Sequence, residues 1–391
     1  MTRQTKQSLS LFFLLALAAG LMVFAHWYGA HTPATPAAPA APAPLPARPE
    51  AGFQGNGDAA PLFGYVPDRQ ATEQFIRSLG PRPDLKTRAP GLFGHDDDQP
   101  VLLYRALYEA YAATHGGQWI VDAQEIGDCV SWGGAHSVDI AGAVLWKLNL
   151  SATWKPAATE ALYGGSRVEA RGVSQGGYRD GSNGGWLAKF VRDYGVVFRE
   201  QYPTVDLTHY SGQRAKDWGN FGCGGRDDNG RLDALCKQHP VRDVALVTTF
   251  NEAAAAIRSG YPVAVCSGQG FSRKRDADGF AAGSGNWAHC MCFIGVRTDR
   301  EGLLCLNSWG PNWISGPKWP ADMPDGSFWV DRRTAERMLA GRDSFAFSGF
   351  AGFPYRKLDH GAWVLHEPDQ VELYTRQLHH SAAEPSYALA P

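Results

Sequence analysis

One cysteine lies where a helix is expected to begin, and it could act as a nucleophile. Cys129 belongs to the segment Gln124-Glu-Ile-Gly-Asp-Cys-Val-Ser-Trp-Gly-Gly134, which leads into an amphipathic run ending near Leu150. The backbone N–H groups and the dipole of a helix N-terminus favour negative charge, so we expect a lowered thiol pKa there. The Cys129 amide and the Gln124 side chain could both donate to an oxyanion. A small buried cysteine at a helix start is the alternative interpretation.

A histidine and an asparagine could complete a set for nucleophilic catalysis. His289 opens an apolar, strand-like run after a Gly- and Ser-rich loop, and Asn307 follows the turn formed by residues 297–302. This turn predicts a β-hairpin that brings Asn307 close to His289. The Asn307 amide could then fix the tautomer of the imidazole, as the third member of a Cys-His-Asn set. Trp309 is placed to cover that hydrogen bond from water.

The other histidines that we considered fit this role poorly. His136 follows Cys129 by seven residues on the same expected helix, which separates the two by roughly 10 Å at 1.5 Å per residue. His209 and His239 lie in polar, loop-like stretches with no following strand that carries an asparagine.

The cysteine spacing argues against a metal or redox centre. The chain has seven cysteines, an odd number, so at least one is free or pairs with another chain. There is no C-x-x-C pair, and the usual zinc-ligand spacings are absent. Cys290, Cys292 and Cys305 lie in apolar runs, so we interpret them as buried structural thiols. Cys223 and Cys236 bracket a polar loop and could pair in an oxidising compartment.

The amino-acid composition, and above all the balance of charges, argues against one class of partner, the nucleic acids. Of 391 residues, 44% are hydrophobic, enough for a sizeable core, and 37 basic residues balance 39 acidic ones. Because no Lys/Arg stripe interrupts this balance, a nucleic-acid partner is not expected. The chemistry sketched above needs neither a metal nor an organic cofactor.

A region that favours helices is followed along the chain by a region that favours strands, and this order predicts the architecture. Residues 118 to about 200 favour helices and Gly-rich loops, whereas residues 261–354 favour short strands. The expected strands are 261–267, 289–296, 303–309, 327–330 and 345–353. A helical part followed by an antiparallel β part indicates an α+β fold, with a cleft where the two parts meet.

We interpret the first 50 residues as a targeting segment and a linker that precede the folded body of the protein. Residues 1–28 hold basic residues and then an apolar run, typical of a signal-anchor or of a cleaved signal peptide. Residues 29–50 form a Pro/Ala-rich linker, a stiff spacer that would hold the body away from a membrane. Both interpretations place the body outside the cytoplasm, in the periplasm or the extracellular space.

Residues 51–117 form an N-terminal extension before the main domain. We expect a short helix over residues 71–79 and a longer one that begins near Pro100 and ends at Gly116. The main domain is expected to span residues 118–356, followed by a C-terminal tail over residues 357–391.

Four segments, taken in chain order, resemble the papain family of cysteine peptidases. They are Gln124 with Cys129 at a helix start, an Ala-His pair at His289, the run Asn307-Ser-Trp-Gly-Pro-Asn-Trp313, and the loop Gly181-Ser-Asn-Gly-Gly-Trp186, which is similar to the family's Gly-Cys-Asn-Gly-Gly loop. The Asn-Ser-Trp-Gly-x-x-Trp motif is specific, and the resemblance covers about residues 118–335.

The resemblance implies a papain-like α+β fold, with a helical half, an antiparallel β-barrel-like half and the active-site cleft between them. It implies hydrolysis of peptide bonds in peptides or proteins, without a cofactor. It also implies that Gly184 and Gly185 bind the substrate backbone, and that Trp186 borders a pocket.

Several residues depart from the family pattern. Gln124 precedes Cys129 by five residues instead of six, and Val130 replaces the tryptophan that usually follows the nucleophile. Ser182 replaces a cysteine of the Gly-Gly loop, so the family's disulfide there is absent. Asp128 would raise the thiol pKa and would also stabilise an imidazolium. Residues 51–117 do not resemble the usual helical propeptide, and the sequence leaves open whether they cover the cleft.

Two other functions remain open at this point. The chain could be a catalytically inactive papain-like binding or structural protein, or a Cys-His amidase that acts on cell-wall peptides. Substrate preference and oligomeric state have no signal in the sequence.

Overall fold

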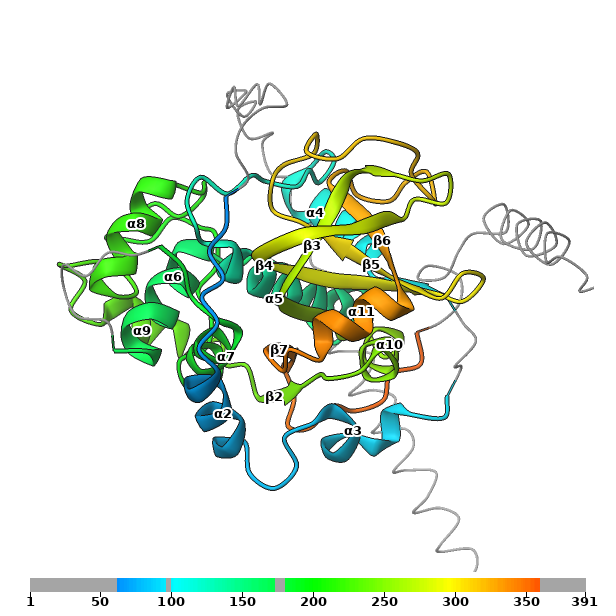
Figure 1. The fold of residues 1–391 in the computed structure, drawn as a ribbon. Coiled ribbons are helices and arrows are strands. Elements are labelled where there is room, and N and C mark those ends of the chain that lie inside the picture. Colours follow the sequence, from blue (N-terminus) through cyan, green and yellow to red (C-terminus); the bar gives the residue numbers. More distant parts are fainter. Residues whose placement is uncertain (1–61, 96–99, 173–179, 359–391) are drawn as a thin grey trace, which may run out of the picture. The chain divides into compact units, whose positions relative to one another are not determined.

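The computed structural model describes residues 62–95, 100–172 and 180–358, which all belong to one compact unit, Gly52–Pro391. Within these residues the chain forms one antiparallel sheet and a set of helices, so the predicted α+β class is confirmed (Figure 1). The predicted signal-anchor, the linker and most of the tail lie outside the described residues. In the described ranges, no helix combines the length and the apolar character needed to cross a bilayer.

The sheet has the strand order β2-β7-β3-β4-β5-β6, with β1 added on β4, and all named pairings are antiparallel. The strands are β1 (Val101–Leu102), β2 (Asp243–Leu246), β3 (Val263–Arg275), β4 (Ala281–Arg297), β5 (Gly302–Leu306), β6 (Ser327–Asp331) and β7 (Ser344–Ser348). The five predicted strands are therefore present. Strands β3 and β4 are longer than predicted, because their Gly- and Ser-rich ends pair with each other through several irregularities.

Twelve helical segments are described. They are α2 (Arg69–Ser78), α3 (Leu85–Arg88), η1 (Pro90–Leu92), α4 (Tyr104–His115), α5 (Cys129–Lys147), α6 (Thr159–Gly165), η2 (Ser166–Ala170), α7 (Gly184–Asp193), α8 (Gly212–Phe221), α9 (Arg231–Cys236), α10 (Phe250–Arg258) and α11 (Arg332–Leu339). Helices α6 to α9 gather beside the sheet as the helical part, at the left in Figure 1.

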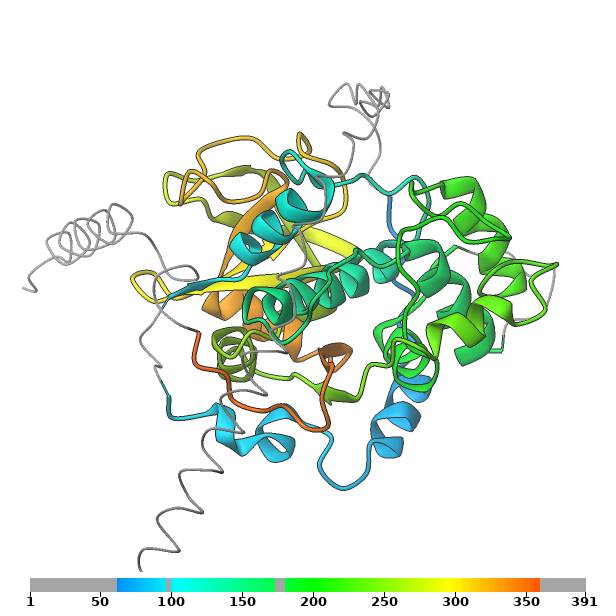
Figure 2. The same cartoon turned by 180° about the vertical axis from the view of Figure 1, so that it is seen from behind.

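Helix α5 joins the two parts and is buried along most of its first two turns. Figure 2 shows it lying across the sheet, with α4 beside it. A Cβ atom at Gly133 would lie 2.9 Å from the sulfur of Cys290 on β4, and one at Gly134 would lie 2.4 Å from Leu187 on α7. Glycines therefore let both partners approach α5 closely, which fixes the position of its first residue, Cys129.

Two clusters of buried apolar side chains support this arrangement. One packs between the sheet and helices α4 and α10, and includes Phe293, Leu304 and Trp329. The other joins α5, α6 and α7 to strands β3, β4 and β7, and includes Phe190 and Phe345. The second cluster holds the helical part against the sheet.

The extension before residue 118 contains ordered elements. Helix α2 matches the short helix predicted over residues 71–79, and Asp68 caps it through its Oδ1, 2.9 Å from the Ala71 amide. The longer helix ends at Gly116 as predicted, but its predicted start near Pro100 is wrong: residues 101–102 pair with β4, and α4 begins at Tyr104. Although β1 and α4 precede residue 118, they pack against β4 and α5. The predicted domain limits stay predictions.

Candidate active site

Cys129 is the first residue of α5 and is fully buried. Its thiol lies close to Cys290, which follows His289 on β4, and to the backbone of Gly64. The helical part and the sheet therefore meet at this sulfur, as the predicted cleft requires.

The thiol of Cys129 is neutral in this structure. Burial raises its pKa well above the usual value, and the nearby groups of Cys290 and Asp128 raise it further. The predicted lowering of this pKa by the helix N-terminus is therefore wrong for the structure as it stands, because removal from water outweighs the helix dipole.

His289 and Asn307 are hydrogen-bonded to each other, and both are fully buried. The imidazole Nε2 lies 2.7 Å from the Asn307 Oδ1, which also accepts a hydrogen bond of 2.7 Å from the Ser308 amide. The hairpin of β4 and β5 sets this contact, as predicted, through pairings such as Cys292 with Leu306.

This geometry fixes the tautomer of His289. Because Oδ1 can only accept, Nε2 carries the proton, and Nδ1 keeps its lone pair. Among the described residues, Nδ1 has no hydrogen-bond partner, so the imidazole makes no hydrogen bond with the Cys129 thiol. Burial lowers the pKa of His289 to about 4, so the ring is neutral.

Aromatic rings cover the imidazole. The ring of Trp309 lies 4.5 Å from the His289 ring, centroid to centroid, in the position predicted for it. The rings of Trp287 and Phe63 lie further out, at 6.4 and 6.1 Å. They keep water away from the His289–Asn307 hydrogen bond.

Gln124 is tied to the residue that follows Asn307. Its side-chain Oε1 accepts from the Ser308 hydroxyl at 2.7 Å, and its backbone amide donates to the Ser308 carbonyl at 2.8 Å. Its Nε2 donates to the carbonyls of Ile126, at 2.8 Å, and of Leu62, at 3.4 Å. The amide predicted to serve an oxyanion is thus occupied by protein carbonyls.

Asp128 is buried directly before Cys129. Its Oδ2 accepts from the Tyr210 hydroxyl at 2.8 Å. Burial raises the pKa of this carboxyl well above its usual value, so it favours the protonated form and its charge on the thiol is reduced. Asp128, which departs from the family pattern, is therefore a largely neutral group beside Cys129.

Residues 62–66 occupy the space between the helical part and the sheet, a run that we call the covering segment. The blue chain in Figure 1 descends between α6 and β4 to reach α2. The amide of Tyr65 donates to the Ala288 carbonyl at 3.0 Å. Ser182 pairs with both neighbours of Tyr65: its amide donates to Gly64 at 2.8 Å, and its carbonyl accepts from Val66 at 2.7 Å. For the question that the sequence left open, the structure shows that part of the extension lies between Ser182 of the helical part and Ala288 of the sheet.

Gly64 lets the covering segment pass close to the backbone just before Cys129. A Cβ atom at this position would lie 1.9 Å from the carbonyl oxygen of Gly127, and that oxygen belongs to the backbone. A residue with a side chain cannot fit here unless the segment moves.

The Gly-Gly loop is used differently from what the sequence predicts. The amides of Gly184 and Gly185 donate to the carboxylate of Asp343, at 3.1 and 2.7 Å, whereas the backbone that meets the covering segment is that of Ser182. Trp186 is buried on α7, and the guanidinium of Arg171 lies 4.2 Å from its ring centre. The substrate-binding roles of these three loop residues stay predictions.

Asp343 and Tyr65 are site residues that the sequence analysis did not single out, and it noted Ser182 only as the replacement of a cysteine. Asp343 lies between α11 and β7, far along the chain from the Gly-Gly loop. Its one sequence signal is a carboxylate directly before an apolar strand, which is a weak one.

The remaining cysteines are all buried thiols. The sulfurs of Cys223 and Cys236 lie 3.9 Å apart and are not bonded, so their predicted pairing is not present in this structure. In the described part of the chain, no group of three His, Cys, Asp or Glu side chains is placed to hold a metal ion.

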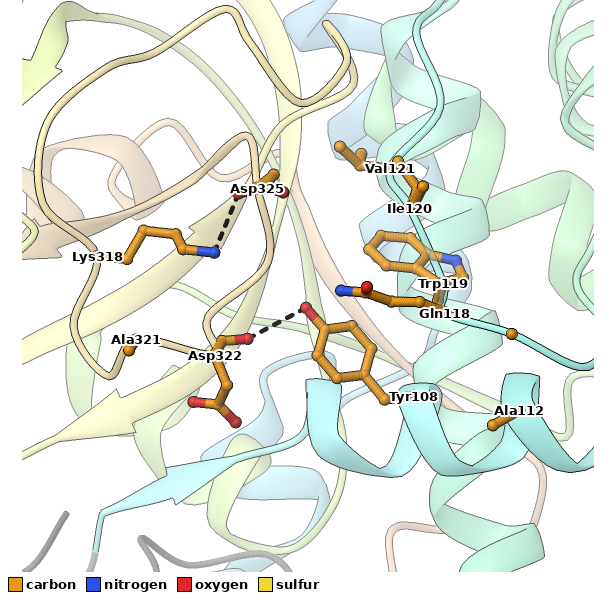
Figure 3. A pocket seen from close by; sticks show the side chains of 11 residues that line it. Tyr108, Ala112, Gln118, Trp119, Ile120, Val121, Lys318, Ala321, Asp322 and Asp325 are labelled. Carbon is orange, nitrogen blue, oxygen red and sulfur yellow. Dashed lines mark hydrogen bonds and ion pairs between the residues drawn. The ribbon is translucent and has the colours of Figure 1, made fainter. Parts of the chain in front are cut away.

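A separate cavity of about 420 Å³ lies between α4 and the loop that carries Asp322. Figure 3 shows the Tyr108 hydroxyl directed at Asp322, to whose backbone carbonyl it donates at 3.2 Å, and Lys318 paired with Asp325. Its lining includes neither Cys129 nor His289.

No protein-family model matches the chain, and no curated protein matches it either. Solved structures similar to it include xylellain, a cysteine protease from Xylella fastidiosa, at 14% identity and a TM-score of 0.44, covering 74% of this chain and 93% of that one. Others are digestive procathepsin L 3 from Tenebrio molitor larval midgut (15%, 0.43, covering 74% and 83%) and procathepsin B S9 from Trypanosoma congolense (12%, 0.45, covering 75% and 87%). At these identities and scores, the function proposed below has to rest on the geometry of the site.

Proposed function

We propose that this protein is a papain-like cysteine peptidase with Cys129 as nucleophile, His289 as base and Asn307 as the residue that orients the base. One observation carries the proposal: Asn307 holds the Nε2–H of His289, which leaves the Nδ1 lone pair without a partner among the described residues, and Cys129 contacts the next residue of the same strand. A nucleophile, a base and a group that orients the base are the parts that thiol catalysis needs, and these observations support the assignment of the three residues to those roles.

The reaction is acyl transfer. His289 Nδ1 takes the thiol proton, and the Cys129 sulfur attacks the peptide carbonyl carbon, while the Cys129 amide and Gln124 Nε2 donate to the oxyanion. The protonated ring gives its proton to the leaving amine, so the C–N bond breaks and a thioester remains. Water then attacks the thioester with His289 again as base, which releases the acid and restores the thiol.

The covering segment supports a peptide as the substrate class. It is an extended stretch of chain held beside Cys129 by backbone hydrogen bonds to Ser182 and Ala288. Backbone pairing of this kind accepts many sequences, because every residue type carries the same amide and carbonyl groups.

The covered form is latent. The covering segment fills the site, the thiol and the imidazole are both neutral, and the Gln124 amide is occupied. Withdrawal of the segment readmits water, which favours the thiolate–imidazolium pair, because both pKa shifts arise first from burial. The segment must therefore leave before a substrate can bind.

Residues 1–28 and 29–50 suggest where the peptidase works. A signal-anchor followed by a Pro/Ala-rich spacer would tether the body outside the cytoplasm, and cleavage of the segment would instead release it. Fractionation of cells that make the full chain, with protease added from outside, checks this: the body should be digested without lysis. Protection of the body until lysis would contradict the proposal.

The test of activity is hydrolysis of an unstructured protein by the full chain. The Cys129→Ala variant should lose turnover entirely, whereas the matched control Cys223→Ala, which removes a buried thiol of the helical part, should keep it. Purified cell-wall peptides are assayed in parallel. Cleavage of wall peptides alone would favour the amidase, and equal turnover by Cys129→Ala would refute the proposal.

A further inference from the structure

Tyr210 binds both ends of the turn that leads into Cys129. Its hydroxyl donates to the Oδ2 atom of Asp128 at 2.8 Å and accepts from the backbone amide of Glu125 at 3.2 Å. One phenol thus bridges the two ends of residues 125–128.

We call residues 125–128 the oxyanion turn, because they join Gln124 to Cys129, the two proposed oxyanion donors. This turn is one residue shorter than in the papain family, as the spacing of Gln124 and Cys129 shows. Donors stabilise an oxyanion only where their N–H groups are directed at it, so the position of both donors matters. Because a short connection passes a movement of the turn on to its neighbours, the donors depend on the contacts that fix the turn.

The phenol orients the side chain of Asp128. This residue is fully buried, and its Oδ1 atom has no hydrogen-bond partner among the described residues. Loss of the phenol would leave Oδ2 without its donor as well, which is unfavourable for a buried polar group. The turn would then have to shift before Asp128 could find another partner.

A buried ion-pair network holds the backbone beside Tyr210. The next residue, Ser211, donates its backbone amide to Glu160 at 2.9 Å. The Glu160 side chain is fully buried and pairs with Arg199 at 3.2 Å and with Arg214 at 3.0 Å. Because removal of one partner would leave a buried charge uncompensated, this network is costly to break and gives Tyr210 a firm support.

Two further contacts join the start of α8 to the same region. The ring of Tyr210 packs edge-on against that of Trp132 on α5, 4.9 Å from centroid to centroid. The amide of Gly212 donates to the carboxylate of Glu125 at 2.9 Å. A Cβ atom at Gly212 would lie 2.5 Å from the Cβ atom of Glu125, so this approach requires a glycine.

We propose that Tyr210 is a positioning residue for the peptidase reaction: its hydroxyl holds the oxyanion turn so that the Cys129 amide and the Gln124 side chain can converge on the oxyanion. The inference deepens the proposed function and rests on it for its kinetic effect. Tyr210 acts through Asp128 and Glu125, and it takes no part in the proton transfers.

The first test is the kinetics of Tyr210→Phe in the full chain, because this change removes the hydroxyl and keeps the ring beside Trp132. We expect kcat to fall about 10- to 100-fold with little change in KM, since the oxyanion donors act in the transition state. The matched control Tyr202→Phe also removes a hydroxyl that accepts from a backbone amide, that of Phe198 at 3.3 Å, and should keep the wild-type kcat. Asp128→Asn, whose side-chain carbonyl can still accept from the phenol, should keep most of the activity that Asp128→Ala loses. An unchanged kcat in Tyr210→Phe would overturn the inference.

A second measurement separates the oxyanion donors from the thiol. The Cys129 sulfur adds to the carbonyl carbon of a peptide aldehyde, and the oxygen of the resulting hemithioacetal takes the place of the oxyanion, whereas iodoacetamide alkylates the sulfur without forming one. Tyr210→Phe should raise the Kd of the aldehyde about 10- to 100-fold and leave the rate of Cys129 alkylation unchanged. Losses of the same size in both assays would show general damage to the site and would overturn the inference.

The two measurements also distinguish this inference from the peptidase proposal. If the wild type cleaves peptides and Tyr210→Phe cleaves them equally well, the positioning role fails alone. If the wild type cleaves no peptide, the peptidase proposal fails and the aldehyde decides: equal affinity in the two chains, or no binding to either, would overturn the role of Tyr210.

Discussion

The Oδ1 atom of Asn307 accepts two hydrogen bonds, and this sharing decides which nitrogen of His289 can act as a base. The Ser308 amide fixes the oxygen, and the oxygen fixes the Nε2–H of the imidazole. The free lone pair on Nδ1 is therefore a consequence of the hairpin geometry, not of the histidine itself. In the proposed mechanism, Asn307 acts as a positioning residue.

Replacement of Asn307 should misplace the base without removing it. We expect Asn307→Ala to lower kcat about 100-fold, with little change in KM, because loss of orientation at a reacting group costs about that factor. The pH profile of kcat should also change, which a purely structural defect would not produce. The control is Asn286→Ala, which removes an exposed asparagine of β4, the strand that carries His289. Equal losses in both variants would contradict the assignment.

Burial of neutral His289 makes stability depend on pH. The pKa is about 4 in the folded chain and about 6.5 in the unfolded chain, so the unfolded state binds the proton first as the pH falls. Stability is therefore lost between pH 6.5 and 4, by roughly 3 kcal/mol for this group. In urea unfolding at pH 7 and pH 4.5, His289→Gln should lose less stability than the wild type, and His209→Gln, at an exposed position, should match the wild type. Identical losses in all three would contradict the burial of a neutral His289.

At the scale of elements, the covering segment behaves as an additional strand between the helical part and the sheet. Its backbone bonds go to Ser182, which precedes α7, and to Ala288 on β4, so it bridges the two walls of the site. It is continuous with α2, which packs against α7. Withdrawal therefore breaks a few hydrogen bonds while α2 can keep its place.

A single methyl group should loosen this segment. Gly64→Ala places a Cβ atom 1.9 Å from a backbone oxygen, which overpacks the contact at a cost of about 1–3 kcal/mol. We expect alkylation of Cys129 by iodoacetamide, followed by peptide mapping, to become roughly 5- to 100-fold faster. Gly91→Ala is the matched control, because a Cβ atom there meets nothing within 4 Å. An unchanged rate in Gly64→Ala would show that the segment does not limit access.

At the scale of the whole molecule, the site exists because α5 places Cys129 from the helical part against the β4–β5 hairpin of the sheet. Two buried clusters support the two walls, and the second cluster includes both Cys129 and Cys290. Packing thus holds both walls, and Cys129 lies where they meet.

Much of this could be predicted because it depends on residue types at short separations. His289 and Asn307 are 18 residues apart, and the turn between their strands sets the pairing. The covering segment could not be predicted, because it is held largely by backbone groups that every residue type carries. The role of Asp343 depends on contacts with Gly184, 159 residues away, and no periodic pattern signals such a contact.

The most direct test of the account is covalent trapping of the nucleophile. A peptide carrying a thiol-reactive group is added to the Gly64→Ala chain, and the modified residue is located by peptide mapping. The account predicts a single adduct on Cys129, formed faster than with free cysteine and slowed at least 100-fold by His289→Ala, since base assistance contributes about 10²–10⁴-fold. An adduct on another cysteine, or a rate on Cys129 that does not depend on His289, would contradict it.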